Sequence, residues 1–134
     1  MKNNNHSNTK IVIQVSTIPN AGRGIFTSKP IKAGEIIEIC PVIILPQKDY
    51  PLIKQTLLRN YYFMWGTNTV AICLGYGSLY NHSYTPNATY MKKIKEKTIE
   101  FIALRDVKKN EEILVNYNYG NPDDKRVLWI EDIA

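Results

Sequence analysis

Residues 75–88 read GYGSLYNHSYTPNA, and this segment says more about the fold than any other part of the chain. It places amide, imidazole and hydroxyl side chains between two apolar runs of the kind that form strands. When such groups are buried, each needs a hydrogen-bond partner from the chain or from a ligand. An isolated Asn81-His82 pair could be a satisfied turn, but a run of this density, closed by Pro86-Asn87, indicates a built site.

Two further segments carry more polar or glycine residues than folding alone requires. Residues 20–26 (NAGRGIF) place a glycine on each side of an arginine, which lets the backbone pass close to another group or adopt a positive φ. Residues 109–120 (KNEEILVNYNYG) place two acids before an apolar strand that ends in Tyr117 and Tyr119. The spacing of two puts both phenols on one face. Taken singly, an ordinary glycine turn and aromatic strand packing explain these two segments.

Turn residues separate short β-type runs along the rest of the chain, which predicts a mostly-β single domain with few short helices. The expected strands cover residues 11–15, 24–27, 35–45, 69–73, 88–94, 98–104 and 112–115. One helix is expected over residues 51–60, where leucines and an isoleucine recur at helical spacing behind Pro51. We expect a flexible N-terminal tail over residues 1–10, the domain over 11–120 and a C-terminal tail over 121–134.

The composition supports one compact domain and gives only a weak indication of its partners. The chain has 134 residues, of which 44% are hydrophobic, and this is enough for one core. Its net charge of +5 slightly favours an acidic partner such as nucleic acid. The densest positive group flanks a predicted hairpin turn, however, and is typical of a solvated edge. It consists of Lys92, Lys93, Lys95 and Lys97.

The cysteines and the apolar stretches exclude several classes of protein. Cys40 and Cys73 lie in apolar runs without a Cys-x-x-Cys pair, so we predict two reduced core residues, with no zinc cluster and no disulfide framework. The N-terminus is polar and Asn-rich, and the longest apolar stretch, around residues 40–46, is too short to cross a bilayer. These features predict a soluble intracellular protein.

Taken in order, the three segments resemble the motifs of the SET family of protein lysine methyltransferases. The matching residues are Gly22-Arg23-Gly24, Asn81-His82-Ser83 with Pro86-Asn87, and Glu111-Glu112 through Tyr117. The resemblance runs from about residue 15 to residue 129 and is closest to the small stand-alone SET proteins of bacteria and viruses. It implies the SET fold, in which short β-sheets surround a C-terminal pseudoknot that brings the second and third motifs together.

The resemblance implies a protein-lysine N-methyltransferase that uses S-adenosyl-L-methionine and releases S-adenosyl-L-homocysteine. Tyr117 takes the place of the catalytic tyrosine, and Tyr90 and Tyr119 fall where the family has aromatic walls of the substrate channel. The residues implied to bind the cofactor are Gly22, Arg23, Gly24, Tyr61, Asn81, His82 and Trp129. No metal is implied. Trp129 belongs to the C-terminal tail that would complete the cofactor site, and it could equally be an anchor that docks this tail on the core.

The implied reaction depends mainly on how the site positions the lysine amine and the methyl group. A lysine amine would displace the sulfonium directly at the methyl carbon, so the site must align the two groups and present the amine uncharged. The pKa of a free lysine is about 10.4, and an apolar tyrosine-lined channel lowers it by desolvation. Tyr117 would orient the reacting groups rather than act as a strong base. In some relatives a further channel tyrosine falls near Cys40, so the number of methyl groups transferred stays open.

The substrate is implied only as a lysine-bearing protein or peptide, which could be a histone, a ribosomal protein or another basic protein. The alternative to an enzyme is a catalytically idle SET module that binds a protein partner or peptide. Such a module would be marked by a lost Tyr117 or a broken Asn81-His82 pair, and both are intact. A nucleic-acid-binding β-domain would leave the three motifs unexplained. A homodimer is left open, no membrane contact is expected, and residence would be cytoplasmic or in a host nucleus.

Overall fold

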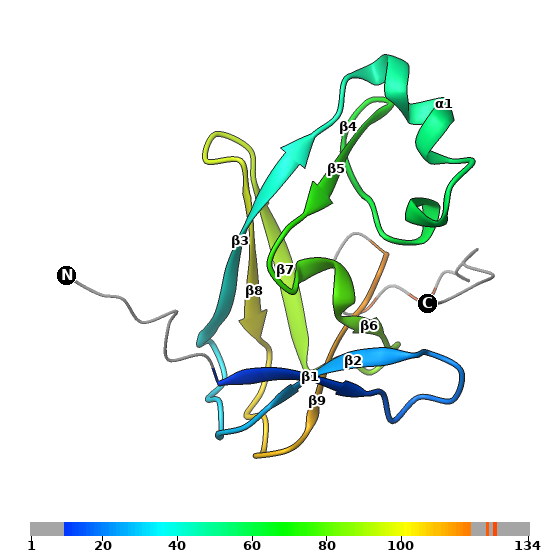
Figure 1. Cartoon of the computed structure of the whole chain (residues 1–134). Helices are drawn as coiled ribbons and strands as arrows, with labels where there is room; N and C mark the ends of the chain where they lie inside the picture. The colour runs from blue at the N-terminus through cyan, green and yellow to red at the C-terminus, as the bar shows by residue number, and fades with distance from the viewer. Residues whose placement is uncertain (1–9, 119–122, 124, 126–134) are drawn as a thin grey trace.

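Nine strands in two sheets dominate the computed structural model, which describes residues 10–118, 123 and 125 (Figure 1). The strands are β1 (Ile11–Val15), β2 (Arg23–Thr27), β3 (Ile36–Ile44), β4 (Phe63–Gly66), β5 (Thr69–Cys73), β6 (Asn81–His82), β7 (Ala88–Lys93), β8 (Thr98–Ala103) and β9 (Glu112–Val115). The helical segments are η2 (Gln47–Asp49), α1 (Tyr50–Ile53), η3 (Leu57–Asn60) and η4 (Gly77–Leu79). The mostly-β prediction is confirmed, and every predicted strand is present with its ends within one residue.

The two sheets are connected so that distant segments become neighbours. The smaller sheet has the order β1-β2-β9-β6, and the larger has the order β4-β5-β3-β8-β7. All paired strands are antiparallel except β6 and β9, where Asn81 lies opposite Leu114 and His82 opposite Val115. A parallel pair needs a long crossover, and here the crossover contains the β7–β8 hairpin of the larger sheet. The second and third motifs therefore lie side by side, as expected.

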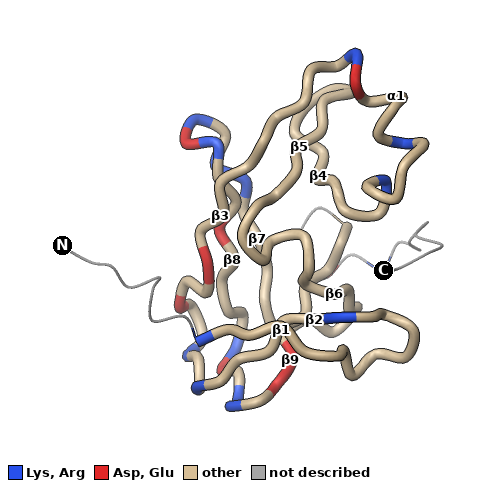
Figure 2. The backbone as a smooth tube through the Cα atoms, viewed as in Figure 1, with Lys and Arg blue, Asp and Glu red and all other residues tan. Residues whose placement is uncertain are grey.

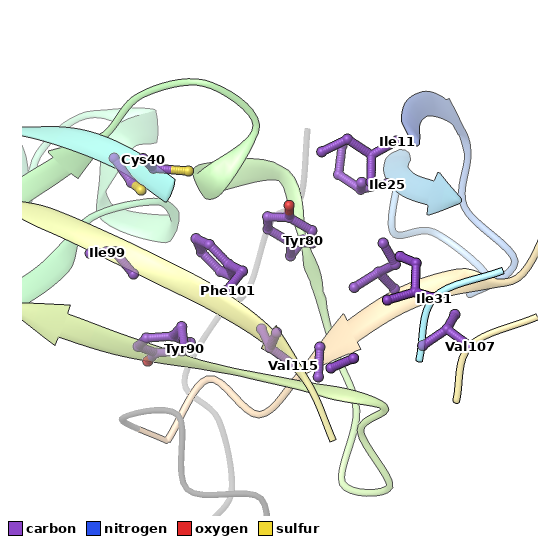
Figure 3. Packing of buried hydrophobic residues seen from close by; sticks show 14 residues of the cluster. Ile11, Ile25, Ile31, Cys40, Tyr80, Tyr90, Ile99, Phe101, Val107 and Val115 are labelled. Atoms are coloured by element: carbon purple, nitrogen blue, oxygen red, sulfur yellow. The ribbon is translucent and has the colours of Figure 1, made fainter. Parts of the chain in front are cut away.

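Both sheets contribute to one core (Figure 3). Ile25 and Ile113 of the smaller sheet and Ile99 and Phe101 of the larger sheet have no exposed surface. Tyr80, which directly precedes β6, is 2% exposed and stacks on Phe101 with ring centroids 4.3 Å apart. The segment that carries Asn81-His82 is thus anchored in the core by a large aromatic side chain.

The helix predicted over residues 51–60 is wrong in extent. The α-helix ends at Ile53, and Thr56 is extended, with its Oγ1 accepting a hydrogen bond from the Leu58 N–H at 3.2 Å. This side chain caps a new 3₁₀ turn instead of continuing the helix. Leu52 and Leu57 are 61% and 51% exposed, so the apolar spacing that suggested a core-facing helix has no core to face. The sequence-based prediction also missed β4, β6 and η4.

The cysteine and lysine predictions had different outcomes. Cys40 and Cys73 are free and buried, as predicted, and hydrogen bonding between the two thiols together with burial raises the pKa of Cys40. The β7–β8 hairpin is present, and positive charge gathers at its turn (Figure 2). Lys95 and Lys97 are exposed, but Lys92 is half-buried, and its Nζ donates to the Met64 carbonyl at 2.5 Å. The solvated-edge interpretation is therefore wrong for Lys92.

No helix in the described part of the chain is long and apolar enough to span a bilayer.

Candidate active site

Residues of all three motifs meet at the buried carboxylate of Glu112, which is 4% exposed, and the first motif contributes the backbone of Gly24. Its oxygens accept hydrogen bonds from Ser16 Oγ at 2.8 Å, Thr17 N at 2.9 Å, Thr17 Oγ1 at 2.6 Å and Asn81 Nδ2 at 3.0 Å. A Cβ added to Gly24 would lie 2.2 Å from Glu112 Oε2, so only glycine fits here. We call Ser16, Thr17, Gly24, Asn81 and Glu112 the Glu112 cluster.

The cluster keeps Glu112 ionised. Burial alone would raise the pKa of this carboxyl, but the hydrogen bonds from Asn81, Thr17 and Ser16 outweigh burial and hold the pKa below its ordinary value. A buried carboxylate that accepts several hydrogen bonds tolerates the loss of any one donor poorly. The arrangement therefore makes the meeting point of the three motifs rigid.

Two asparagines fix the strands around this point. The Asn81 amide nitrogen donates to the Arg23 carbonyl at 2.9 Å as well as to Glu112. Asn87 is 1% exposed, and its side chain donates to the Glu112 carbonyl at 2.8 Å and accepts from the Leu114 N–H at 2.8 Å. Both amides thus replace backbone partners across the crossover, which explains why the segment after residue 80 is rich in Asn.

His82 connects this region to Tyr117. The Tyr117 N–H donates to His82 Nδ1 at 3.0 Å, so Nδ1 is unprotonated and the neutral ring carries its hydrogen on Nε2. Burial lowers the pKa of His82, which favours this neutral form. Nε2 is buried and has no hydrogen-bond partner among the described residues. Tyr84 packs edge-on against the His82 ring at 4.4 Å. Lys125 Nζ donates to the Tyr84 carbonyl at 2.6 Å, so Lys125 contacts the residue that covers this histidine.

A cavity of about 500 Å³ opens beside Tyr117, a size typical of small-ligand sites. Its wall comes from the α1–η3 segment, β4, η4, β7 and the residues after β9. The side chains that define its interior are Tyr61, Phe63, Ser78, Tyr80, Tyr90 and Tyr117. We call it the tyrosine cavity. Lys54, Arg59 and Lys92 also line it, and no carboxylate is among its described lining residues.

Tyr117 is held at both ends inside this cavity. Its phenol donates to the Tyr80 carbonyl at 2.7 Å, while its N–H is bound to His82. Tyr90 Oη donates to the Tyr117 carbonyl over a long 3.5 Å, and the Tyr90 ring meets Phe63 edge-on at 5.1 Å. Burial, reinforced by the neighbouring Tyr61 and Tyr90 phenols, raises the pKa of Tyr117. The Tyr117 hydroxyl therefore keeps its proton at neutral pH.

The predicted site residues fall into two groups that Tyr117 joins. Tyr61, Tyr90 and Tyr117 line the tyrosine cavity. Gly24 and Asn81 belong to the Glu112 cluster, Gly22 (φ 74°) and the exposed Arg23 lead into it, and His82 links it to Tyr117. Tyr119 and Trp129 lie outside the described residues. Cys40 is not among the described lining residues of the cavity and packs in the core instead.

Sequence reasoning missed three residues that the structure places at or behind the site. The partly buried Glu38 accepts a hydrogen bond from the phenol of the buried Tyr80 at 2.7 Å, and the Tyr80 carbonyl in turn contacts Tyr117. Lys92 turns from the hairpin into the cavity wall. A signal existed for Glu38, because a single acid in the apolar run of residues 36–45 is out of pattern on an inward-facing strand. No comparable signal marks Lys92, since its position depends on which face of β7 meets β4.

The sequence and the structure are similar to those of known proteins. Residues 22–118 match the SET domain. A Schizosaccharomyces pombe histone-lysine N-methyltransferase, H3 lysine-37 specific, is 32% identical over 123 residues, covering 91% of this chain and 79% of that protein.

The solved structures agree with this match. The crystal structure of a candidate histone methyltransferase from Plasmodium falciparum has a TM-score of 0.68 and 36% identity, over 83% of this chain and 95% of that chain. A Chaetomium thermophilum polycomb repressive complex 2 bound to S-adenosylmethionine has a TM-score of 0.69 over 85% of this chain and 16% of that chain, and at 19% identity it shows the fold alone. With the match spanning most of the chain, this protein belongs to the SET-domain family.

Proposed function

We propose that this protein is an S-adenosylmethionine-dependent protein-lysine N-methyltransferase. The observation that carries the proposal is the position of Tyr117. Its protonated phenol lies inside a cavity walled by Tyr61 and Tyr90, and its backbone is bonded to His82 of the Asn-His motif. One residue thereby connects a channel suited to an alkylamine with the segment that the family uses for its cofactor.

The residues present are consistent with such a cofactor. His82 Nε2 is a buried donor without a partner among the described residues, and buried donors normally find one. We assign cofactor binding to Gly22, Arg23, Gly24, Tyr61, Asn81 and His82, with Trp129 from the C-terminal segment. When bound, S-adenosylmethionine supplies a methyl group on a sulfonium sulfur. Both described uses of the Asn81 amide nitrogen are structural, so other atoms of Asn81 would make its cofactor contact.

The tyrosine cavity would prepare the lysine amine. Its aromatic walls remove the amine from water, and desolvation favours the uncharged form that can react. The cavity lining also contains three cations, Lys54, Arg59 and Lys92. They repel the positive charge of a bound lysine ammonium and so also favour the uncharged amine. The phenols of Tyr61, Tyr90 and Tyr117 would orient the amine, and Tyr119 would extend this wall.

The substrate proposed is a lysine in a basic protein, with histones as the first class to test. The names of the fission-yeast and Plasmodium relatives support this choice. Cys40 is not among the described residues of the cavity wall, so the number of methyl groups transferred would depend on phenols that are, with Tyr61, Tyr90 and Tyr117 the ones proposed to hold the amine. Cytoplasmic or nuclear residence and homodimer formation stay predictions.

Calorimetry with S-adenosylhomocysteine and a labelled-methyl transfer assay on core histones together test the proposal. Wild type should bind S-adenosylhomocysteine and transfer label. Tyr117→Phe should retain binding but lose about 100-fold in rate, because the orienting hydroxyl is gone. Tyr76→Phe removes a phenol that is not among the described lining residues of the cavity and should behave as wild type.

Two results would contradict the proposal in different ways. Absence of S-adenosylhomocysteine binding by wild type would remove the cofactor and with it the enzyme. Binding without transfer to any histone or other basic protein, combined with equal peptide affinity of wild type and Tyr117→Phe, would leave a SET-shaped binding module.

A further inference from the structure

Glu38 is an acid on the inward face of β3, the central strand of the larger sheet. A bulge between Ile36 and Glu38 shifts the register, and Glu38 then lies opposite Phe101 of β8. The surrounding residues of the strand are apolar, and the next inward residue is the fully buried Cys40. A carboxylate at such a place needs hydrogen-bond donors directed at it.

The donors come from the segment that leads to the Asn-His motif. Glu38 Oε2 accepts from the Tyr76 N–H at 3.0 Å, and Glu38 Oε1 accepts from the Tyr80 hydroxyl at 2.7 Å. Gly75 has φ 63°, and a Cβ at this residue would lie 2.5 Å from Glu38 Oε2. The chain from Gly75 to Tyr80 is therefore shaped closely around this carboxylate.

Tyr80 carries the effect from Glu38 to Tyr117. Its ring stacks on Phe101 in the core, and its phenol is bound to Glu38. Burial, followed by the neighbouring Glu38 charge, raises the pKa of the Tyr80 phenol, so this group stays a donor. At the other end of the residue, the Tyr80 carbonyl accepts the hydrogen bond from the Tyr117 hydroxyl at 2.7 Å. One side chain and one carbonyl of the same residue thus join Glu38 to Tyr117.

We propose that Glu38 and the Tyr80 phenol are positioning residues that set the direction of the Tyr117 hydroxyl. The inference rests on the proposed function, since it assigns these residues a part in placing the reacting amine. Glu38 is not among the described lining residues of the tyrosine cavity and acts only through Tyr80. A Phe at residue 80 would fill the same space and stack equally on Phe101. The hydroxyl is therefore not required for packing, and Glu38, which is only partly buried, keeps the Tyr76 N–H as a donor when the hydroxyl is removed.

The test compares Tyr80→Phe, Glu38→Gln and their double variant, with Tyr76→Phe as the matched control. Tyr80→Phe should lower kcat about tenfold, while the KM for the methyl donor and the affinity for S-adenosylhomocysteine change less than twofold. The double variant should be no slower than the slower single variant, because the two groups act in series. Tyr76→Phe alters a phenol of the same segment and should leave kcat unchanged.

A second background separates positioning from general damage. In Tyr117→Phe the hydroxyl that Tyr80 orients is gone, so adding Tyr80→Phe should have no further effect on the residual rate. A multiplied loss in this background, a loss of S-adenosylhomocysteine affinity, or a Tyr80→Phe rate within twofold of wild type would each overturn the positioning role.

A readout that needs no activity keeps this inference distinct from the proposed function. In protein labelled with ¹³C at the tyrosine Cζ atoms, the Tyr117 signal, assigned from its disappearance in Tyr117→Phe, should shift in Tyr80→Phe and in Glu38→Gln but not in Tyr76→Phe. If wild type transfers no methyl group while this signal responds, the proposed function fails and the positioning stands. If the signal does not move in either variant, the positioning role fails, whatever the activity.

Discussion

The Glu112 cluster and the tyrosine cavity are joined through Tyr117 and its partner His82, but their packing is opposite. Around Glu112 the hydrogen bonds are 2.6–3.0 Å long, and a single added methyl group at Gly24 would collide with the carboxylate. In the cavity about 500 Å³ is open, and the hydrogen bond from Tyr90 Oη to the Tyr117 carbonyl is 3.5 Å long. The side chains of the first region are packed closely against one another, and the second region has room for a bound group.

This difference separates residues that hold the fold from residues that handle a substrate. The three motifs of the chain come together in the rigid region, where a substitution leaves a buried polar group without its partner. The phenols of Tyr61, Tyr90 and Tyr117 line the open cavity, where a bound group can reach them. We therefore expect substitutions in the Glu112 cluster to lower the free energy of unfolding and substitutions in the tyrosine cavity to alter activity with little change in stability.

The largest effect on stability is expected for Glu112→Gln. The side-chain amide keeps the volume of the carboxylate but presents a donor to Ser16, Thr17 and Asn81, which are donors themselves. Breaking a buried charged network in this way costs about 3–5 kcal/mol of unfolding free energy. Urea denaturation measures this change in the free energy of unfolding, and Glu96→Gln in the exposed β7–β8 turn is the control. A loss below about 1 kcal/mol would show that the cluster is not the rigid centre of the fold.

A smaller decrease in the free energy of unfolding is expected for Gly24→Ala. The new Cβ would approach Glu112 Oε2 to 2.2 Å and Asn81 Nδ2 to 2.9 Å, so both side chains must move. Overpacking of this kind costs about 1–3 kcal/mol. Gly66→Ala is the control, because the nearest atom to its Cβ would be 3.9 Å away. Equal stability of the two variants would show that the Glu112 carboxylate can move aside and that this close approach does not require glycine at residue 24.

Local sequence patterns were enough for seven of the nine described strands, whereas the meeting of the second and third motifs was implied by the family resemblance. The runs at residues 11–15, 69–73 and 112–115 are β-branched and bounded by turn residues, and each forms a strand with the predicted ends. The helix over residues 51–60 failed because helical spacing of leucines does not say whether a core is there to receive them. With Leu52 and Leu57 in solvent, the local preference of Thr56 for a capping turn prevailed.

The parts of the site that sequence reasoning missed all depend on contacts between distant segments. Glu38 and Tyr80 are 42 residues apart, and Lys92 and the Met64 carbonyl are 28 apart. Motif matching found Asn81 and Gly24, but it treated both as cofactor ligands. Their shared contact with Glu112 became visible only once β6, β2 and β9 were placed in one sheet.

Acidification tests the contributions of His82 and of the Glu112 cluster to stability in steps. The pKa of His82 is lowered by burial and that of Glu112 by its hydrogen bonds, so for both groups the unfolded chain binds protons more readily than the folded chain. The free energy of unfolding should therefore fall as pH drops below 6.5, the ordinary value for His82, and fall again below 4.5, the ordinary value for Glu112. Denaturation at pH 7.5, 5.5 and 4 measures this.

Two variants assign the two steps of this pH dependence. The first decrease should disappear in His82→Gln, whose side-chain oxygen can still accept from the Tyr117 N–H. The second should become smaller in Glu112→Gln, and the part that remains comes from Glu35 and Glu111, whose pKa values are also lowered. Stability that rises on acidification would contradict the lowered pKa of both groups.

The smallest effect on stability is expected for Tyr90→Phe, and here activity should change instead. The bond from Tyr90 Oη to the Tyr117 carbonyl is long, and the edge-on contact of the ring with Phe63 survives the substitution. The free energy of unfolding should therefore fall by only about 0.5 kcal/mol.

Removal of the Tyr90 hydroxyl leaves more space beside the reacting amine and one fewer partner to hold it. We expect mass spectrometry of the peptide product to show more highly methylated lysine than wild type gives. The control variant Tyr76→Phe removes a phenol that is not among the described lining residues of the cavity and should leave the product unchanged. If Tyr90→Phe instead destabilises the protein as much as Gly24→Ala while the product stays the same, the cavity is as rigid as the Glu112 cluster, and the division between fold and chemistry lies elsewhere in the molecule.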